Sequence, residues 1–310
     1  MKKTIDILQF GDFHLELVPA FLELLTQCNN AAEFVIRINR NADSAGWLEY
    51  CATTFPDFRV VLKTTHPDRD SIKLFLTAGE VFHLPVLPRD SFLINHTPAE
   101  CKIGTTVALT PLVNRNFILP IYRTPVFHRV QLQDVIIGVV GISTSENKSF
   151  SDMATILSTF PRVKIVFFTR QVSKDTVDLA NLFRGRVLLE FSNTAVELVR
   201  KIKSYVSFLL LTPSEKSYHL LDRLSGMIPL SLSCNIPLVT DTKIKSIYSL
   251  KSSITLNEFL SFKEDDLFTG SYSSNFPSTS SDFNYYLGHN YNELQRLVQI
   301  GVTSPLYQRI

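Results

Sequence analysis

The sequence predicts an α/β protein made of two Rossmann-like domains in series. Short apolar runs of strand length alternate with amphipathic helical segments from the start of the chain. The alternation breaks over residues 121–134, which contain a proline and mixed polarity, and then begins again. Strands that alternate with helices form parallel sheets with helices on both faces. A length of 310 residues is sufficient for two such domains.

The composition is that of a folded globular protein, with 45% hydrophobic and 19% charged residues. A net charge of +2 without a long basic run gives no indication of nucleic-acid binding. No apolar segment approaches the ~20 residues of a membrane span. The four cysteines are scattered without metal-ligand spacing, which is typical of a reducing compartment. We therefore expect a cytoplasmic protein with no transmembrane segment and no nucleic-acid partner.

The first domain is expected over residues 1–125. Its order of elements begins with a buried-strand pattern, "TIDILQF", followed by a helix whose apolar residues fall on one face. A third helix, "DRDSIKLFLTAG", is expected to end at Gly79, because glycine suits a helix C-cap. The expected strands are residues 4–10, 33–39, 58–65, 80–87, 91–97 and 105–113, and the expected helices are residues 17–25, 44–55 and 68–79.

The second domain is expected over residues 126–282. Thr194 and Glu197 fit a T-x-x-E capping box at the start of one of its helices. The Ser-rich residues 269–281 predict a loop or a mobile flap. Residues 283–310 are expected to form a helix that returns to the first domain. The expected strands are residues 135–143, 163–170, 186–192, 206–212 and 237–240, and the expected helices are residues 150–160, 173–183, 194–206 and 227–232.

Ligands of open parallel sheets bind beyond the carboxyl ends of the strands. In the second domain, Lys148, Arg170 and Arg223 are candidates to face one crevice at these ends. Ser225 and Gly226 precede an apolar helix, whose unpaired N–H groups and positive end suit an anion. The sequence has no Walker A loop and no GxGxxG after a strand, so the inventory suits a phosphate or diphosphate better than a dinucleotide. The competing interpretation is that the cations are solvated and that the two residues only cap a buried helix.

Residues 209–241 resemble the nucleotide-sugar loop of GT-B glycosyltransferases. A strand ends in Pro213–Ser214, an acidic loop with a glycine, Asp222–Gly226, opens a helix, and the strand segment "SCNIPLVTD" follows. The segment "GVVGISTSENKSF" is similar to another part of that fold that carries a lysine, here Lys148. The resemblance implies a GT-B-like fold in which two Rossmann-like domains face each other across a cleft. It also implies a transferase that uses a nucleotide-diphosphate sugar as donor, with no other cofactor and no metal.

The resemblance assigns roles to individual residues. In the first domain, His14 would deprotonate the acceptor hydroxyl, with Asp12 as the competing base. The alternative for this pair is an Asp12 helix cap beside a half-buried His14. The cations would neutralise the departing diphosphate, and the acid of the loop would bind a ribose or sugar hydroxyl. The residues expected to bind the nucleotide sugar are Lys148, Arg170, Pro213, Ser214, Asp222, Arg223, Ser225 and Gly226.

Two other classes of function stay open at the level of sequence. Counting back from Cys234, the two acids that the GT-B family places eight residues apart fall on Asp222 and Leu230, so the second acid is lost. A catalytically inactive glycosyltransferase-like protein that serves as a binding or scaffold protein is therefore the alternative to an enzyme. The third class is a two-lobed small-molecule receptor whose ligand makes no phosphate contacts.

Overall fold

The structure is a computed structural model, which divides into two compact units. Unit 1 comprises residues 1–122, 222–224 and 286–310, and unit 2 comprises residues 123–221 and 225–285. The sequence-based domain boundaries were placed after residues 125 and 282. The structure describes residues 3–9, 17–27, 32–38, 46–54, 59–61, 72–75, 91–95, 105–112, 117–129, 134–141, 143–192, 194–214, 217 and 224–303.

Unit 1 contains a parallel sheet whose described strands follow the order β3-β2-β1-β4-β5-β6. The strand nearest the N-terminus, β1, lies inside the sheet because it pairs with both β2 and β4. Helix α1 is buried along residues 17–24, and the buried stretch includes the polar Glu23. The elements are β1 (Lys3–Gln9), α1 (Leu17–Gln27), β2 (Ala32–Ile38), α2 (Trp47–Thr54), β3 (Arg59–Val61), β4 (Ile72–Phe75), β5 (Ser91–Asn95) and β6 (Thr105–Ala108).

The predicted helix over residues 68–79 is wrong, because this segment contains strand β4. Ile72 lies beside Ile5 of β1, and Lys73 lies beside Ser91 of β5, so β4 has a strand on each side. Leu74 is buried, as the interior of a parallel sheet requires. A short apolar run does not distinguish strand from helix by its periodicity, and here pairing with two neighbours decides. The strand expected over residues 80–87 lies outside the described residues.

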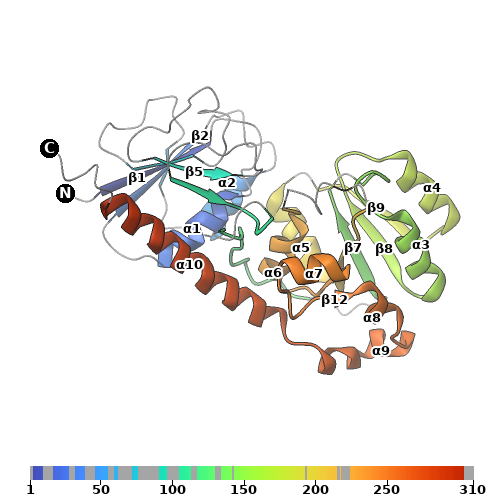
Figure 1. The fold of residues 1–310 in the computed structure, drawn as a ribbon. Helices are drawn as coiled ribbons and strands as arrows, with labels where there is room; N and C mark the ends of the chain where they lie inside the picture. Colours follow the sequence, from blue (N-terminus) through green and yellow to red (C-terminus); the bar gives the residue numbers. More distant parts are fainter. Residues whose placement is uncertain are drawn as a thin grey trace. The chain divides into compact units, whose positions relative to one another are not determined.

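Unit 2 contains a second parallel sheet, whose described strands follow the order β12-β11-β10-β7-β8-β9. Helices α3 and α4 lie together on one face of this sheet, and α5 and α6 lie together on the other (Figure 1). The elements are β7 (Ile136–Val140), α3 (Phe150–Thr159), β8 (Lys164–Phe168), α4 (Lys174–Leu182), β9 (Val187–Glu190), α5 (Ala195–Tyr205), β10 (Phe208–Leu211), α6 (Met227–Cys234), β11 (Leu238–Thr240), α7 (Thr242–Ile247), β12 (Ile254–Thr255), α8 (Leu256–Leu260), α9 (Glu264–Thr269) and the start of α10 (Thr279–Thr303), whose residues from 286 onward belong to unit 1.

The core of unit 2 is formed by alternate residues of the strands, because successive side chains point to opposite faces. On one face, Ile137, Ile165 and Phe208 of three neighbouring strands share a buried cluster with Met153 and Ile156 of α3. This burial explains why residues 135–240, with their regular strand and helix periods, follow the sequence-based elements closely, whereas α7, β12, α8 and α9 were not among the expected elements.

On the opposite face of the sheet, Gly138 in the central strand β7 allows neighbouring side chains to pack closely against the backbone. An ideal Cβ on Gly138 would lie 3.0 Å from Leu209 Cδ2, 3.1 Å from Val206 Cγ1 and 3.2 Å from Phe168 Cε2.

We expect Gly138→Ala to lower the free energy of unfolding by about 1–3 kcal/mol, because added atoms in a filled core force neighbours to move. At Gly226 a Cβ would meet nothing within 4 Å, and φ is −59°. Gly226→Ala is the control in urea denaturation, with a change within about 0.5 kcal/mol. Equal effects of the two substitutions would contradict the close approach at Gly138.

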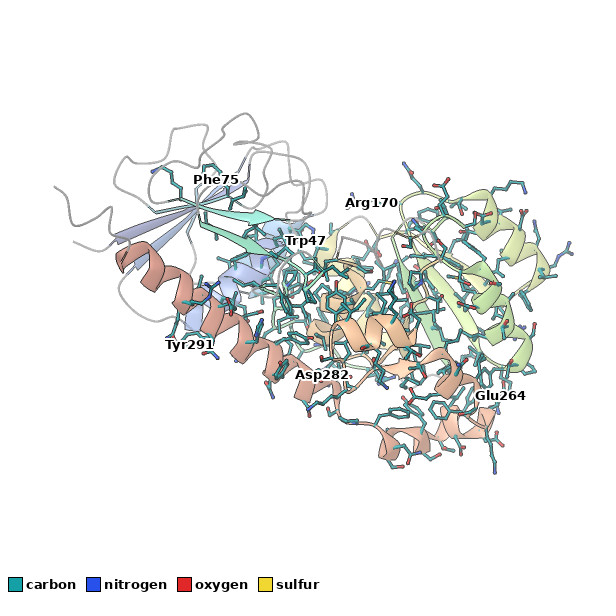
Figure 2. All side chains as sticks on the ribbon, in the orientation of Figure 1. Trp47, Phe75, Arg170, Glu264, Asp282 and Tyr291 are labelled. Carbon is teal, nitrogen blue, oxygen red and sulfur yellow. The ribbon has the colours of Figure 1, made fainter. Side chains whose placement is uncertain are left out.

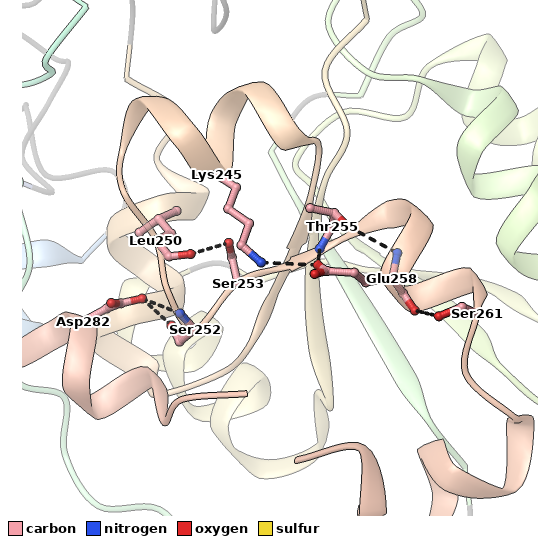
Figure 3. Close-up of polar contacts among 8 residues, drawn as sticks. All are labelled: Lys245, Leu250, Ser252, Ser253, Thr255, Glu258, Ser261 and Asp282. Carbon is pink, nitrogen blue, oxygen red and sulfur yellow. Dashed lines mark hydrogen bonds and ion pairs between the residues drawn. The ribbon is translucent and has the colours of Figure 1, made fainter. Parts of the chain in front are cut away.

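Two helix starts in unit 2 use threonine caps. The hydroxyl of Thr194 accepts the N–H of Glu197, as the predicted capping box requires, while the Glu197 carboxylate lies 3.0 Å from Nζ of Lys201. The complete reciprocal box occurs at α8, between Thr255 and Glu258 (Figure 3). The same T-x-x-E spacing in the sequence could have predicted α8.

The Ser-rich segment 269–281 is not a loop throughout. A 3₁₀ helix covers Ser271–Asn275, and α10 already begins at Thr279, earlier than the residue 283 that was expected. The 3₁₀ helix is ordered because the Tyr272 ring lies 4.9 Å from that of Phe208 in the core. The first turn of α10 is held by the buried Asp282, whose carboxylate accepts the N–H and the hydroxyl of Ser252 at 2.7 and 2.6 Å (Figure 3).

Candidate functional site

The carboxyl edge of the unit 2 sheet carries several chain segments that hydrogen bonds hold together. The N–H of Gly141, after β7, donates to the carbonyl of Phe168 at the end of β8 at 2.9 Å. The N–H of Ser149 donates to the carbonyl of Thr212, after β10, at 2.8 Å. Gly141 has φ of +88°, a conformation that glycine adopts without strain. The ends of β7, β8 and β10 therefore form one continuous surface, as the parallel topology predicts.

Lys148 is the central group of this edge, and it is almost completely buried, with 5% of its surface exposed. Its Nζ donates to the carbonyl of Val140 at 2.7 Å and to the hydroxyl of Ser143 at 3.0 Å. Both acceptors are neutral, and within the part of the chain that the structure describes no carboxylate forms an ion pair with Nζ. Burial lowers the pKa of Lys148 to about 7. Lysine with such a pKa and no counter-ion is typical of a functional site.

The loop that carries Lys148 is fixed by polar contacts from two helices. The Lys148 N–H donates to the Thr144 carbonyl at 2.9 Å, which closes a turn before α3. Asp175 of α4 accepts the N–H of Ser145 at 2.8 Å. Ser149 caps α3 by accepting the N–H of Asp152. These contacts hold Lys148 at the strand end, and they explain why a lysine eight residues after Val140 reaches back to its carbonyl.

The residues after β10 supply one further polar group. The Thr212 hydroxyl is buried and has no hydrogen-bond partner among the described residues. Ser214 differs, because its hydroxyl donates to the carbonyl of Glu146 and its N–H donates to the carbonyl of Asn147 at 3.4 Å. Ser214 therefore joins two loops, and Pro213 beside it is half-buried. A buried hydroxyl without a partner is rare in folded proteins, so this group requires an explanation.

Hydrogen bonds within the chain occupy two N–H groups at the start of α6. Gly226 is exposed and immediately precedes the helix, and Ser225 is buried. The Ser225 hydroxyl accepts the N–H of Met227 at 3.4 Å, and the Ser225 carbonyl accepts the N–H of Ile228 at 3.1 Å. The next residue, Pro229, has no N–H. No acceptor among the described residues is found for the N–H of Gly226.

Of the other residues considered for the site, Arg170 and Leu230 lie within the described part of the chain. Arg170 follows β8 at the same edge, and its side chain is exposed (Figure 2). Leu230, onto which the resemblance places the second acid, is a buried apolar residue of α6. The predicted residues His14, Asp12, Asp222 and Arg223 lie outside the described residues.

Metal and membrane sites are not found in the described part of the chain. Among the residues described, no group of three or more His, Cys, Asp or Glu side chains could hold a metal ion. A search of the same residues finds no helix with the length and apolar character to span a membrane. Cys51 and Cys234 are buried and form no disulfide among the described residues, and burial raises the pKa of the Cys234 thiol to about 12, which makes this thiol unreactive.

Solved structures share this fold at low sequence identity. No protein-family model and no curated protein matches the chain. AviGT4, a glycosyltransferase involved in avilamycin A biosynthesis, gives a TM-score of 0.56 at 9% identity over 96% of this chain and 97% of its own. The O-GlcNAc transferase of Thermobaculum terrenum, solved as a mutant, gives a TM-score of 0.56 at 14% identity over 97% of this chain and 67% of its own. HepE of Anabaena, solved with UDP and glucose, gives a TM-score of 0.51 at 10% identity over 98% of this chain and 99% of its own. The predicted α/β fold with GT-B-like, Rossmann-like domains is confirmed.

Proposed function

We propose that this protein is a glycosyltransferase that moves a sugar from a nucleotide-diphosphate sugar to an acceptor hydroxyl without a metal ion. Unit 2 binds the donor and unit 1 binds the acceptor. The observation that carries the proposal is Lys148, a buried lysine without a carboxylate partner in the described chain, at the edge where sheets of this class bind ligands. A buried, unpaired ammonium is unfavourable, and a diphosphate would pair it.

The chemistry of sugar transfer fits such a cation. Negative charge develops on the departing nucleotide diphosphate, and a positioned ammonium stabilises that charge in the transition state. Arg170 is the second cation for this role, and the unpartnered Thr212 hydroxyl is a donor for a phosphate oxygen. Gly226 adds one backbone N–H, and Pro213–Ser214 shapes the loop. Asp222 and Arg223 toward the donor, and His14 with Asp12 toward the acceptor, complete the proposal as sequence-based predictions.

Nucleotide binding provides the test. We expect UDP, GDP or ADP to raise the melting temperature of the wild-type protein. Lys148→Met should weaken binding of the stabilising nucleotide by about 10–100-fold, the scale of a hydrogen bond between charged groups. Lys164→Met is the matched control. Lys164 is the first residue of β8, so it lies at the amino ends of the strands, and its Nζ pairs with Asp134 at 2.6 Å. Its nucleotide affinity should stay within about twofold. Absence of stabilisation by all three nucleotides would contradict the proposal.

A catalytically inactive binding or scaffold protein is the second candidate, favoured by Leu230. All the residues of α6 are buried and none is acidic, so this helix offers no carboxylate to a donor sugar. The two candidates differ in turnover. Release of free nucleotide from a nucleotide sugar, persisting in EDTA and abolished by His14→Ala together with Asp12→Ala, would exclude the inactive protein. Tight nucleotide binding without such release would favour it.

A further inference from the structure

The hydrogen bonds of Lys148 match the N–H groups of a neutral amine better than those of an ammonium. An amine has two N–H donors, and the site provides two acceptors, the Val140 carbonyl and the Ser143 hydroxyl. The Ser143 hydroxyl donates in turn to the Gly141 carbonyl at 3.3 Å, so it accepts from Lys148. An ammonium has a third N–H, for which the described residues provide no acceptor. Among the described residues, the unliganded site therefore provides an acceptor for both N–H groups of the amine, but for only two of the three N–H groups of the ammonium.

The charges on the neighbouring elements do not compensate for this burial. The loop of Lys148 carries Glu146, whose side chain is exposed, and α3 carries Asp152 in its first turn. On α4, Asp175 accepts a backbone N–H of the loop, and Arg170 after β8 is exposed. Residues 208–214 and 217, from β10 onward, contain no titratable side chain, and α6 contains only the buried Cys234. None of these described groups pairs with Nζ.

We propose that a nucleotide diphosphate and a proton bind to this site together, with the proton taken up by Lys148. The inference rests on the proposed function, because it concerns the regulation of the same site. Before binding, burial favours the amine; a diphosphate provides the missing acceptor and a negative charge, so it favours the ammonium. Binding is then tight below neutral pH and weakens as the pH rises, because the proton must be taken from solution. The pKa of Lys148, about 7, places this change in the physiological range.

The proton count gives the inference a measurable size. With a pKa of about 7 in the unliganded protein, roughly three quarters of Lys148 is amine at pH ~7.5, so UDP binding should take up about 0.7 proton. The dissociation constant should rise about five- to tenfold from pH ~7.5 to ~8.5. Free UDP contributes little to this change, because the second pKa of a phosphate group lies near about 6.

Isothermal titration calorimetry of the full chain with UDP, in buffers of different ionisation enthalpy, measures this proton count directly. Wild type and Lys164→Met should both take up the proton. Lys148→Arg keeps a positive charge at every pH, so any UDP that it binds should bind without proton uptake. Because the larger side chain can disturb the buried site, the second measurement is the ¹³Cε shift of Lys148 in wild type, assigned by its loss in Lys148→Met. It should titrate near neutral pH without UDP and stay that of the ammonium with UDP.

The outcomes separate this inference from the proposed function. UDP binding with no proton uptake, or with unchanged affinity from pH ~7 to ~9, would overturn the inference and leave nucleotide binding intact. Proton uptake that persists in Lys148→Arg, or a ¹³Cε shift that shows an ammonium throughout this range without UDP, would overturn it as well. No binding of UDP, GDP or ADP at any pH would overturn the proposed function, and the inference with it.

Discussion

Replacing Lys148 by methionine should make the protein more stable at neutral and acidic pH, by about 2–4 kcal/mol in the free energy of unfolding. The side chains have similar length, and methionine needs no hydration in the buried site. A pKa lowered from 10.5 to about 7 corresponds to an unfavourable free energy of about 4–5 kcal/mol for the charged form. Loss of the hydrogen bonds to Val140 and Ser143 offsets about 1–2 kcal/mol of the gain.

The gain should disappear at alkaline pH, and the sign follows from the two pKa values. Below pH ~7 lysine is charged in both states, and only the folded state carries the unfavourable burial. Between pH ~7 and ~10.4 the unfolded chain binds more protons, so the wild-type protein gains stability as the pH rises. Above that range the lysine is neutral in both states, and the advantage of methionine is lost.

Urea denaturation at pH ~6, ~8 and ~10 measures this dependence. Lys164→Met, which removes the partly exposed ion pair with Asp134, should change stability by less than about 1 kcal/mol, with little change from pH ~6 to ~8. A lysine whose removal stabilises the fold and weakens nucleotide binding is present for function, since natural proteins give up stability at functional sites. If Lys148→Met destabilises the protein at pH ~6, the lysine is a structural residue and the proposed donor site loses its central group.

Residues 135–240 were predictable because their local signals agree with their tertiary structure. The T-x-x-E spacing at Thr194 marks α5, and apolar residues recur with the strand and helix periods throughout. The first half gave one clear error, at β4. The periodicity of the segment around Ile72–Phe75 does not distinguish helix from strand, and pairing with β1 and β5, distant in sequence, makes it a strand. Pairing of this kind is not encoded in local periodicity.

The candidate site shows the same division between local and tertiary information. The resemblance selected Lys148 as a phosphate ligand, but its burial and its two neutral acceptors depend on β7 and the returning loop. At α6, by contrast, the sequence contained an overlooked signal. Pro229 in the first turn lacks an N–H, so the helix start was already a poorer anion site than a general helix N-terminus.

Aromatic contacts hold the Ser-rich segment 269–281 against the core of unit 2. The second large change in stability is expected when Phe259, in this aromatic cluster, is replaced. Its side chain is completely buried in α8, with ring centroids 5.2 Å from Phe208 and 5.5 Å from Phe160. Tyr272 of the 3₁₀ helix contacts the same Phe208 ring. Phe259→Ala should therefore lower the free energy of unfolding by about 3–5 kcal/mol, because it removes buried area and leaves a cavity in the core.

The effect should extend to the 3₁₀ helix, since Tyr272 and Phe276 pack against the cluster that contains Phe259. Urea denaturation measures the stability, and amide hydrogen exchange of residues 271–276 should become faster in Phe259→Ala. Phe191→Ala is the matched control, because Phe191 is 52% exposed, and its change should stay within about 0.5 kcal/mol. A loss below about 1 kcal/mol in Phe259→Ala, or unchanged exchange at residues 271–276, would contradict the aromatic cluster as the reason why a segment so rich in serine is ordered.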